Sequence, residues 1–262
     1  MAEYQYVRVA VENRIATLTI DHPPANAFNK QVIEELGSAF DEVTANAGVK
    51  AIIITGAGQF FIAGADINEI YDIKDKPEEA TAFIRKGQEL FLKIEKSNKP
   101  VIAAMNGRFA LGGGNELAMA CHVRIAEDGL RLGQPEINLG IIPGWGGTQR
   151  LPRIVGTGKA LEMILTGDHI TAQEAYRIGL VNKVVPTGRV LKEATGIAKR
   201  IISMSALPIA AIIRAVNQGL EQSLEEGLET ESQQFVSLQG SEDMDEGLKA
   251  FLEKRKPQFK DK

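Results

Sequence analysis

The sequence predicts an α/β fold, because short buried strands alternate with amphipathic helices over most of the chain. Residues 4–21 hold two runs of alternating apolar residues around Asn13, a pattern typical of a β-hairpin. Residues 51–54 and 101–105 are short, uninterrupted apolar runs, which favours strands that are buried on both faces. A further strand is expected near residues 123–126.

Helices are expected between and after these strands. Asn29 is a suitable N-cap for a helix whose apolar residues recur with helical spacing. A second helix is predicted over residues 78–96, where apolar side chains gather on one side, and Pro100 ends it. Thr171 followed by Glu174 predicts a capping box at the start of another helix.

In the last part of the chain strand patterns become scarce and helices dominate. Helices are predicted over residues 197–220, 224–238 and 243–254. We therefore divide the chain into an α/β core, residues 1–196, and a helical C-terminal region, residues 197–262. A region of about 65 residues is small for an independent hydrophobic core. We expect it to pack on the core or on a neighbouring subunit.

The composition narrows the class of protein. The chain has 262 residues, of which 44% are hydrophobic and 24% are charged, as in ordinary globular proteins. Its net charge of −4 argues against a broad affinity for nucleic acid, and its single cysteine, Cys121, excludes an intrachain disulfide or a cysteine-based zinc site. The N-terminus lacks a signal-peptide pattern, and no apolar run reaches the roughly 18 residues of a membrane span. A cytoplasmic protein without a membrane segment is expected.

The segment 110–150 contains the strongest candidates for chemistry. Glu116 follows three consecutive glycines, and Glu136 follows Gly-Gln-Pro. Two carboxyl groups that face one water can act as general base and general acid, if one proton is shared between them. The alternatives are that Glu116 only offsets a helix dipole, and that Glu136 forms a salt bridge to Arg131 or Arg150.

A second glycine turn, Ala63-Gly64-Ala65-Asp66, could present a free backbone N–H. That N–H and the N–H of Gly113 could form an oxyanion hole. The alternative is a simple turn into a helix with Asp66 as N-cap.

Other familiar motifs are weak. Residues 156–160 lack the upstream glycine and the hydroxyl residue of a P-loop, and no GxGxxG follows an expected strand. His22, His122 and His169 have no metal-ligand spacing, and no GxSxG elbow supports a serine triad. Cys121 lies among apolar residues, which favours a packing role over a nucleophilic one.

Taken together, five segments resemble the enoyl-CoA hydratase/isomerase (crotonase) superfamily, and among its members the hydratases most. The matching segments are Phe61–Ile67, Ala110–Leu117, Gly133–Ile137, Pro143–Leu151 and Glu246–Lys256. They are long, occur in the family's order and extend over nearly the whole chain. The resemblance implies a crotonase-like spiral of ββα turns, with a helical C-terminal region that forms homotrimers, often paired into hexamers.

The resemblance also implies a substrate and a reaction. The substrate is an acyl-CoA thioester, and the reaction is the reversible addition of water to a trans-2-enoyl-CoA without a metal or redox cofactor. The N–H groups of Ala65 and Gly113 would hold the thioester oxygen, while Glu116 and Glu136 would hold the reacting water, with Glu136 delivering the proton to C2. The CoA moiety would lie along Ala63, Gly64, Ala65, Asp66, Ile67, Asn68 and Gly113.

Several points remain open from the sequence. Trp145 would shape the acyl pocket or simply pack in the core, and Lys254–Lys256 would reach the CoA phosphates of a neighbour or only offset a helix dipole. Isomerases of this fold usually change one or both of the two acids, so hydration is favoured over isomerisation. The alternatives are an isomerase of this fold and a hydratase for a branched, aromatic or alicyclic acyl group. An RNA-binding member of the family is disfavoured by the acidic net charge.

Overall fold

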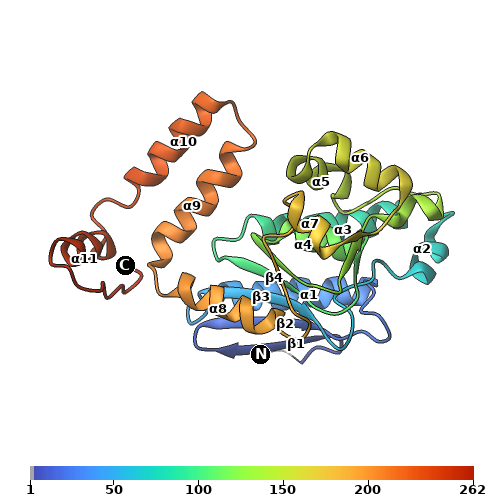
Figure 1. The fold of residues 1–262 in the computed structure, drawn as a ribbon, viewed down its shortest axis with the longest axis horizontal. Helices are drawn as coiled ribbons and strands as arrows, with labels where there is room; N and C mark the ends of the chain where they lie inside the picture. Colours follow the sequence, from blue (N-terminus) through green and yellow to red (C-terminus); the bar gives the residue numbers. More distant parts are fainter. Residues whose placement is uncertain (1–2) are drawn as a thin grey trace.

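The computed structural model describes residues 3–262. A six-stranded sheet with the strand order β1-β2-β3-β4-β6-β9 forms the centre of the core (Figure 1), and a second, small sheet has the order β5-β7-β8. The strands are β1 (Val7–Glu12), β2 (Ile15–Ile20), β3 (Ala51–Gly56), β4 (Val101–Met105), β5 (Phe109–Leu111), β6 (Val123–Glu127), β7 (Arg131–Gly133), β8 (Ile170–Thr171) and β9 (Lys183–Val185).

The expected hairpin and the three expected internal strands are confirmed. β1 pairs with β2 antiparallel, from Val7 opposite Ile20 to Glu12 opposite Ile15. The remaining neighbours in the large sheet, from β2 to β9, are parallel. Parallel neighbours require crossover connections, which the intervening helices provide.

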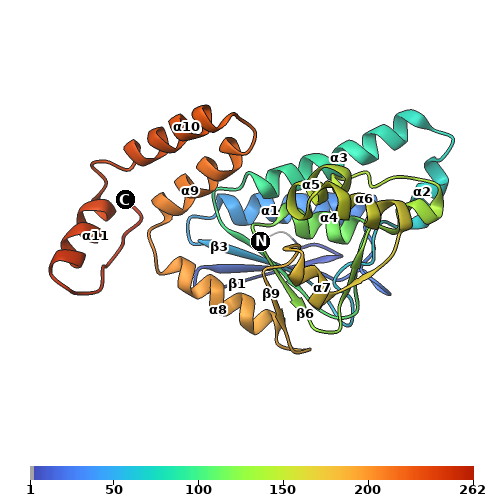
Figure 2. The ribbon, with the colours of Figure 1, turned by 45° about the horizontal axis from the view of Figure 1, so that its top comes forward.

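Helices cover both faces of the large sheet. α1 (Lys30–Ala45) and α3 (Pro77–Glu95) lie on one face, and α8 (Val190–Ile202) lies on the other (Figure 2). Ile52 and Ile54 belong to the larger apolar cluster under α1, whereas Ile53 packs with the smaller cluster under α8. This alternation follows from the two-residue period of a strand.

The start of α1 agrees with the prediction. Asn29 is its N-cap, and the Asn29 Oδ1 accepts a hydrogen bond of 2.7 Å from the Val32 N–H. Thr171 likewise caps α7 (Ala172–Arg177) through a bond from the Glu174 N–H. The second bond of the expected capping box, from the Thr171 N–H to the Glu174 carboxylate, is not made, because this carboxylate pairs with Arg177 at 2.7 Å.

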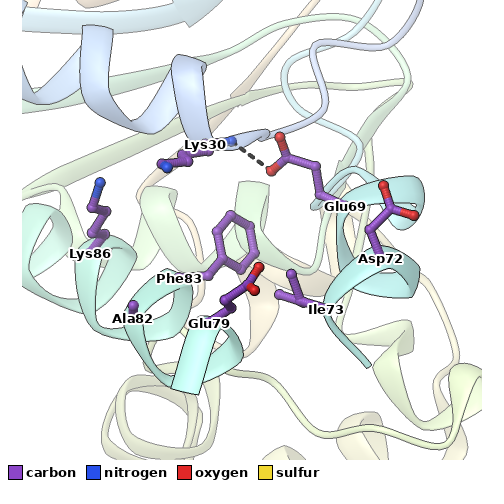
Figure 3. A pocket seen from close by; sticks show the side chains of 8 residues that line it. All are labelled: Lys30, Glu69, Asp72, Ile73, Glu79, Ala82, Phe83 and Lys86. Atoms are coloured by element: carbon purple, nitrogen blue, oxygen red, sulfur yellow. Dashed lines mark hydrogen bonds between the residues drawn. The ribbon is translucent and has the colours of Figure 1, made fainter. Parts of the chain in front are cut away.

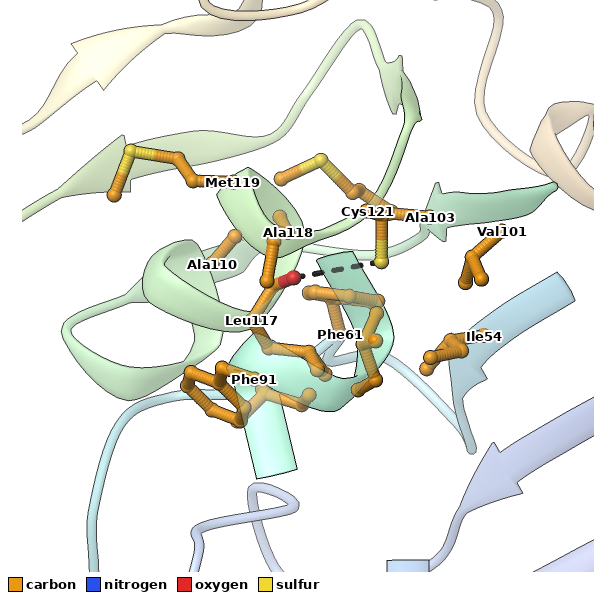
Figure 4. Close-up of a cluster of buried hydrophobic side chains, with 14 of the residues drawn as sticks. Ile54, Phe61, Phe91, Val101, Ala103, Ala110, Leu117, Ala118, Met119 and Cys121 are labelled. Atoms are coloured by element: carbon orange, nitrogen blue, oxygen red, sulfur yellow. Dashed lines mark hydrogen bonds between the residues drawn. The ribbon is translucent and has the colours of Figure 1, made fainter. Parts of the chain in front are cut away.

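The short helix α4 (Gly113–Ala120) lies inside the core, and all its residues are buried. Cys121 follows it, and its Sγ donates a hydrogen bond of 3.4 Å to the Leu117 carbonyl oxygen within an apolar cluster (Figure 4). Burial raises the pKa of the Cys121 thiol to about 12. The predicted packing role of this cysteine is confirmed.

The prediction of a single helix over residues 197–220 is wrong. The structure has two helices there, α8 and α9 (Ala206–Gly219), which meet at an angle of 108°. Ser205 caps the start of α9, and the Lys50 Nζ bonds the Met204 carbonyl oxygen at the break. Local capping and a lysine distant in sequence therefore end α8, although the apolar periodicity continues.

α9, α10 (Leu224–Val236) and α11 (Glu242–Leu252) form an arm that extends away from the sheets (Figure 1). The C-terminal tail returns to the core, where Asp261 forms ion pairs of 2.7 Å with both Lys50 and Arg14. The boundary that we placed after residue 196 falls inside α8, and this helix packs on β3, β4 and β6 of the core. Within residues 3–262, no single helix is long and apolar enough to cross a bilayer.

Candidate active site

The two glycine turns identified in the sequence meet in the structure. The segment that leads to the first turn runs beside β5, because the Leu111 N–H donates to the Ile62 carbonyl oxygen at 3.1 Å and Ile62 pairs with Ala110. This pairing brings Gly64 against Gly112, where a Cβ on Gly112 would be only 3.8 Å from the Gly64 Cα. Two turns almost 50 residues apart thus form one wall.

Each turn presents a backbone N–H that bonds no protein group among residues 3–262. Gly113 is the first residue of α4, where an N–H has no partner within the helix. The Ala65 N–H is also without an acceptor, although the neighbouring Gly64 carbonyl and Asp66 N–H both bond to Phe28 at 2.8 Å. Two unpaired N–H donors side by side are suited to an oxygen that gains negative charge.

The turn residue Asp66 also fulfils its alternative role. It caps α2 (Ile67–Ile73), accepting bonds of 2.9 Å from the Asn68 N–H and 3.0 Å from the Asn68 Nδ2. Ile67 and Asn68 are exposed. The loop is therefore both a helix start and a surface open to a ligand.

Glu116 lies on the first turn of α4 and is 1% exposed. Its Oε1 accepts hydrogen bonds of 2.8 Å from the Trp145 N–H and 2.6 Å from the Gly147 N–H, at the start of α5 (Gly147–Val155). Two amide donors favour the carboxylate form of a buried acid. Glu116 is therefore more than an acid that offsets a helix dipole.

Glu136 lies on a 3₁₀ helix, η1 (Pro135–Leu139). A Cβ on Gly112 would lie 2.8 Å from the Glu136 Oε1, so this carboxyl group reaches the glycine wall. Its Oε2 is buried and bonds no protein group in the described part of the chain. The alternative salt bridge to Arg150 is not formed, because Arg150 pairs with Glu95 at 2.7 Å.

Both acids hold their protons more tightly than usual. Burial, and after it the charge of Glu136, raise the pKa of Glu116 from 4.5 to about 7, although the bonds from Gly147 and Trp145 oppose the shift. Burial also raises the pKa of Glu136 to about 7. Two carboxyl groups with pKa values near 7 can hold one proton between them near neutral pH, an arrangement suited to one base and one acid.

Trp145 packs in the core and also forms part of the site. Its indole is 3% exposed and contacts Phe28, Phe83 and Phe91 with centroid separations of 5.7, 5.3 and 5.9 Å. The ring also lies against Gly113, since a Cβ at that position would collide with it. The two roles considered from the sequence are compatible, because the indole is both core and inner wall.

A pocket of about 340 Å³ opens between α2, α3 and the start of α1 (Figure 3). The sequence did not predict this pocket, although Phe83 was part of an expected apolar helix face. Phe83 separates the pocket from the Trp145 indole. The lining residues are Lys30, Glu69, Asp72, Ile73, Glu79, Ala82, Phe83 and Lys86.

The positively charged segment Lys254–Lys256 is not adjacent to the pocket beside α2 within one chain. α11 and α2 lie at opposite ends of the molecule (Figure 1), and Arg255 forms ion pairs of 2.6 Å with both Glu246 and Glu253. Among residues 3–262, no group of three or more His, Cys, Asp or Glu side chains is arranged to hold a metal ion.

Comparison with known proteins identifies the family. Residues 10–262 match the family described as Enoyl-CoA hydratase/isomerase. This chain belongs to the enoyl-CoA hydratase/isomerase family. The crotonase-like fold expected from the sequence is confirmed by a crystal structure of enoyl-CoA hydratase from Bacillus anthracis, which has a TM-score of 0.94 and 37% identity, with 98% of this chain and 100% of that one covered.

Curated relatives from this family match over almost their whole length. A probable enoyl-CoA hydratase of Bacillus subtilis is 47% identical over 97% of this chain and 98% of its own. A crotonyl-CoA hydratase of Syntrophomonas wolfei is 45% identical, with 98% of both chains covered. A short-chain-enoyl-CoA hydratase of Clostridium acetobutylicum is 43% identical, with 97% of both chains covered.

Proposed function

We propose that this chain is an enoyl-CoA hydratase that adds water reversibly to a trans-2-enoyl-CoA and forms a 3-hydroxyacyl-CoA. The observation that carries the proposal is the pair of acids, Glu116 and Glu136, each with its pKa raised to about 7, beside two free N–H donors. The names of the curated relatives agree with this reaction.

The geometry suggests how the roles divide. The thioester oxygen lies between the N–H groups of Ala65 and Gly113, which stabilise the negative charge that develops as water attacks. Glu116, whose carboxylate is favoured by two amide donors, takes a proton from the water as its oxygen bonds to C3. Glu136 gives its proton to C2, and the proton on Glu116 then replaces it, so that one H and one OH are added.

The acyl group is proposed to be short. The Trp145 indole, packed against Gly113 and three phenylalanines, limits the space beyond the reacting carbons. Two of the relatives are named for crotonyl or short-chain substrates. Short-chain acyl-CoA metabolism, including β-oxidation of fatty acids, is the corresponding setting, and a cytoplasmic location remains part of the proposal.

The decisive experiment follows the enoyl-thioester absorbance of crotonyl-CoA in the ultraviolet after addition of the purified protein. We expect rapid decay with the wild type, and a kcat at least ~10²-fold lower for Glu136→Gln and for Glu116→Gln. Glu12→Gln, at an exposed position on β1, is the matched control and should retain full activity. Unchanged turnover in either site variant would refute the assigned roles.

No resident cofactor is required by this mechanism. Activity is therefore expected to survive dialysis against EDTA followed by desalting. Loss of activity that a divalent metal restores would contradict this part of the proposal.

Assembly into a homotrimer, or a dimer of trimers, completes the proposal. The C-terminal arm leaves many large apolar side chains exposed, which is unusual for an isolated soluble chain. They are Ile212, Val216, Leu220, Leu224, Leu228, Phe235, Val236, Leu248, Phe251 and Leu252. A partner copy would cover this surface, and the acyl-CoA substrate remains the proposed small-molecule partner.

A further inference from the structure

Gln134 has a fully buried side-chain amide. It lies between the segment that carries Glu136 and the segment that holds Gly147, whose N–H bonds Glu116. It is 0% exposed and lies immediately before η1, which carries Glu136. One end of the amide faces two carbonyl oxygens, which only a donor can satisfy, so we assign the nitrogen to that end. In this orientation Nε2 donates to the Gly133 oxygen at 2.9 Å and to the Gly112 oxygen at 3.1 Å. The opposite end of the amide lies against Gly147, whose N–H bonds Glu116.

The bond to Gly112 bears on the oxyanion hole through covalent structure. The carbonyl oxygen of Gly112 and the N–H of Gly113 belong to one planar peptide group and point in opposite directions. A donor that holds the oxygen therefore also sets the direction of the N–H. Hydrogen bonding at the oxygen polarises the peptide group and makes its N–H a stronger donor.

This peptide group needs such support because its backbone conformation is unusual. Gly112 has φ +49° and ψ −122°, which residues with a side chain rarely adopt. Its N–H donates to the Gly133 oxygen at 3.0 Å, and its oxygen also accepts from the Glu116 N–H at 2.9 Å. Gln134 supplies the only side-chain donor that the structure gives for this oxygen within residues 3–262.

We propose that Gln134 is a positioning residue for the oxyanion hole, which fixes and polarises the Gly112–Gly113 peptide group so that its N–H faces the thioester oxygen. This inference rests on the proposed hydratase function. In this proposal the effect of Gln134 reaches the reaction through the Gly113 N–H and the carbonyl of the bound thioester, so the carbonyl reports it separately from any effect on the two acids.

The thioester carbonyl is therefore the right reporter. We would bind butyryl-CoA, carrying ¹³C at the thioester carbonyl, and record the shift of its infrared carbonyl band relative to free ligand. Butyryl-CoA has no double bond to hydrate, so the band is measured without turnover. The variants are Gln134→Met, which keeps the length of the side chain without a donor, and Gln134→Glu, with the exposed Gln173→Met on α7 as control.

For Gln134→Met we expect a smaller carbonyl shift and a kcat roughly tenfold lower on crotonyl-CoA, less than the 10²–10³ typical of a lost oxyanion donor. For Gln134→Glu we expect kcat, relative to wild type at the same pH, to recover as the pH falls, because only the protonated carboxyl can donate to the Gly112 oxygen. Gln173→Met should match the wild type in both measurements.

Two results would overturn the inference. The first is an unchanged carbonyl shift in a folded Gln134→Met, whatever happens to kcat, and the second is a Gln134→Glu variant that shows no recovery at low pH. Failure of the proposed function is recognised separately, because a wild type that shifts the butyryl-CoA band but does not consume crotonyl-CoA binds the thioester without being a hydratase for it.

Discussion

The backbone N–H of Trp145 donates a hydrogen bond of 2.8 Å to the Glu116 Oε1, while the indole of the same residue lies against Gly113. One residue therefore supports the proposed catalytic acid through its main chain, and in the proposed function its side chain limits the acyl space. Because the N–H remains in any variant except proline, the two effects can be separated by substitution.

Trp145→Ala is expected to change the preference for acyl chain length. Removing the indole opens space beside Gly113, so kcat/KM for octenoyl-CoA relative to crotonyl-CoA should rise at least tenfold. The same change removes a buried aromatic side chain and should lower the free energy of unfolding by about 3–5 kcal/mol. Trp145→Phe is the control with an intermediate volume, and an unchanged ratio in both variants would exclude an acyl-pocket role.

The activity should depend on pH as a bell-shaped curve centred near neutral. Below the titration range both acids are protonated and the base is lost, and above it both are ionised and the acid is lost. The check is kcat/KM for crotonyl-CoA between pH 5 and pH 9. A plateau that continues to pH 9 would contradict a proton-donating role for either glutamate.

The same pKa shifts predict how stability depends on pH. The pKa of Glu116 rises from 4.5 in the unfolded chain to about 7 in the folded protein, so the folded state binds more protons between these values. The contribution of the Glu116 carboxyl group to the free energy of unfolding is fully present below about pH 4.5 and is lost as the pH rises through 7. Glu116→Gln should flatten that decline by on the order of 2 kcal/mol, as measured by urea unfolding at pH 5 and pH 8.

Substitution of glycine by alanine is expected to have opposite effects on stability at the candidate site and at a position remote from it. A Cβ at Gly113 would collide with the Trp145 indole, so Gly113→Ala should lower the free energy of unfolding by about 1–3 kcal/mol and reduce kcat strongly. Gly196, inside α8, has open space around it, and Gly196→Ala should instead stabilise the protein by about 0.5–1 kcal/mol. Similar effects of the two changes would refute this account of the glycine wall.

Cys121 should be chemically silent in the native protein. With its thiol buried and its pKa raised to about 12, roughly one thiol in 10⁴ is ionised at pH 8. A chromogenic disulfide reagent is expected to react only after unfolding in urea, with a stoichiometry of one thiol per chain. Rapid reaction of the folded protein would contradict the packing role.

The proposed assembly can be tested on its exposed surface. Leu228→Asp combined with Phe235→Asp places two charges on α10, and we expect dissociation of the oligomer when its mass is measured by light scattering. Tyr176→Asp, at an exposed apolar residue on α7, is the matched control. A wild type that is monomeric at micromolar concentration would refute the assembly.

Local patterns were enough to predict the elements near the candidate site and to select Glu116 and Glu136 as its candidate acids. The hairpin, the Asn29 cap and the first turn of the Glu116 helix each depend on a few neighbouring residues, so short-range spacing encodes them. The prediction was wrong over residues 197–220, because apolar periodicity registers neither the local cap at Ser205 nor the bond from the distant Lys50, which together stabilise the break.

Three-dimensional packing alone reveals how the site is assembled. Strand pairing brings Gly64 to Gly112, and the fold delivers the N–H of Gly147 to Glu116 and the amide of Gln134 to the Gly112 oxygen. None of these contacts can be read from periodic patterns in the sequence, because each joins residues that are more than 20 positions apart. The chain thus encodes its acids locally, whereas their raised pKa values and their supporting bonds arise only from long-range burial.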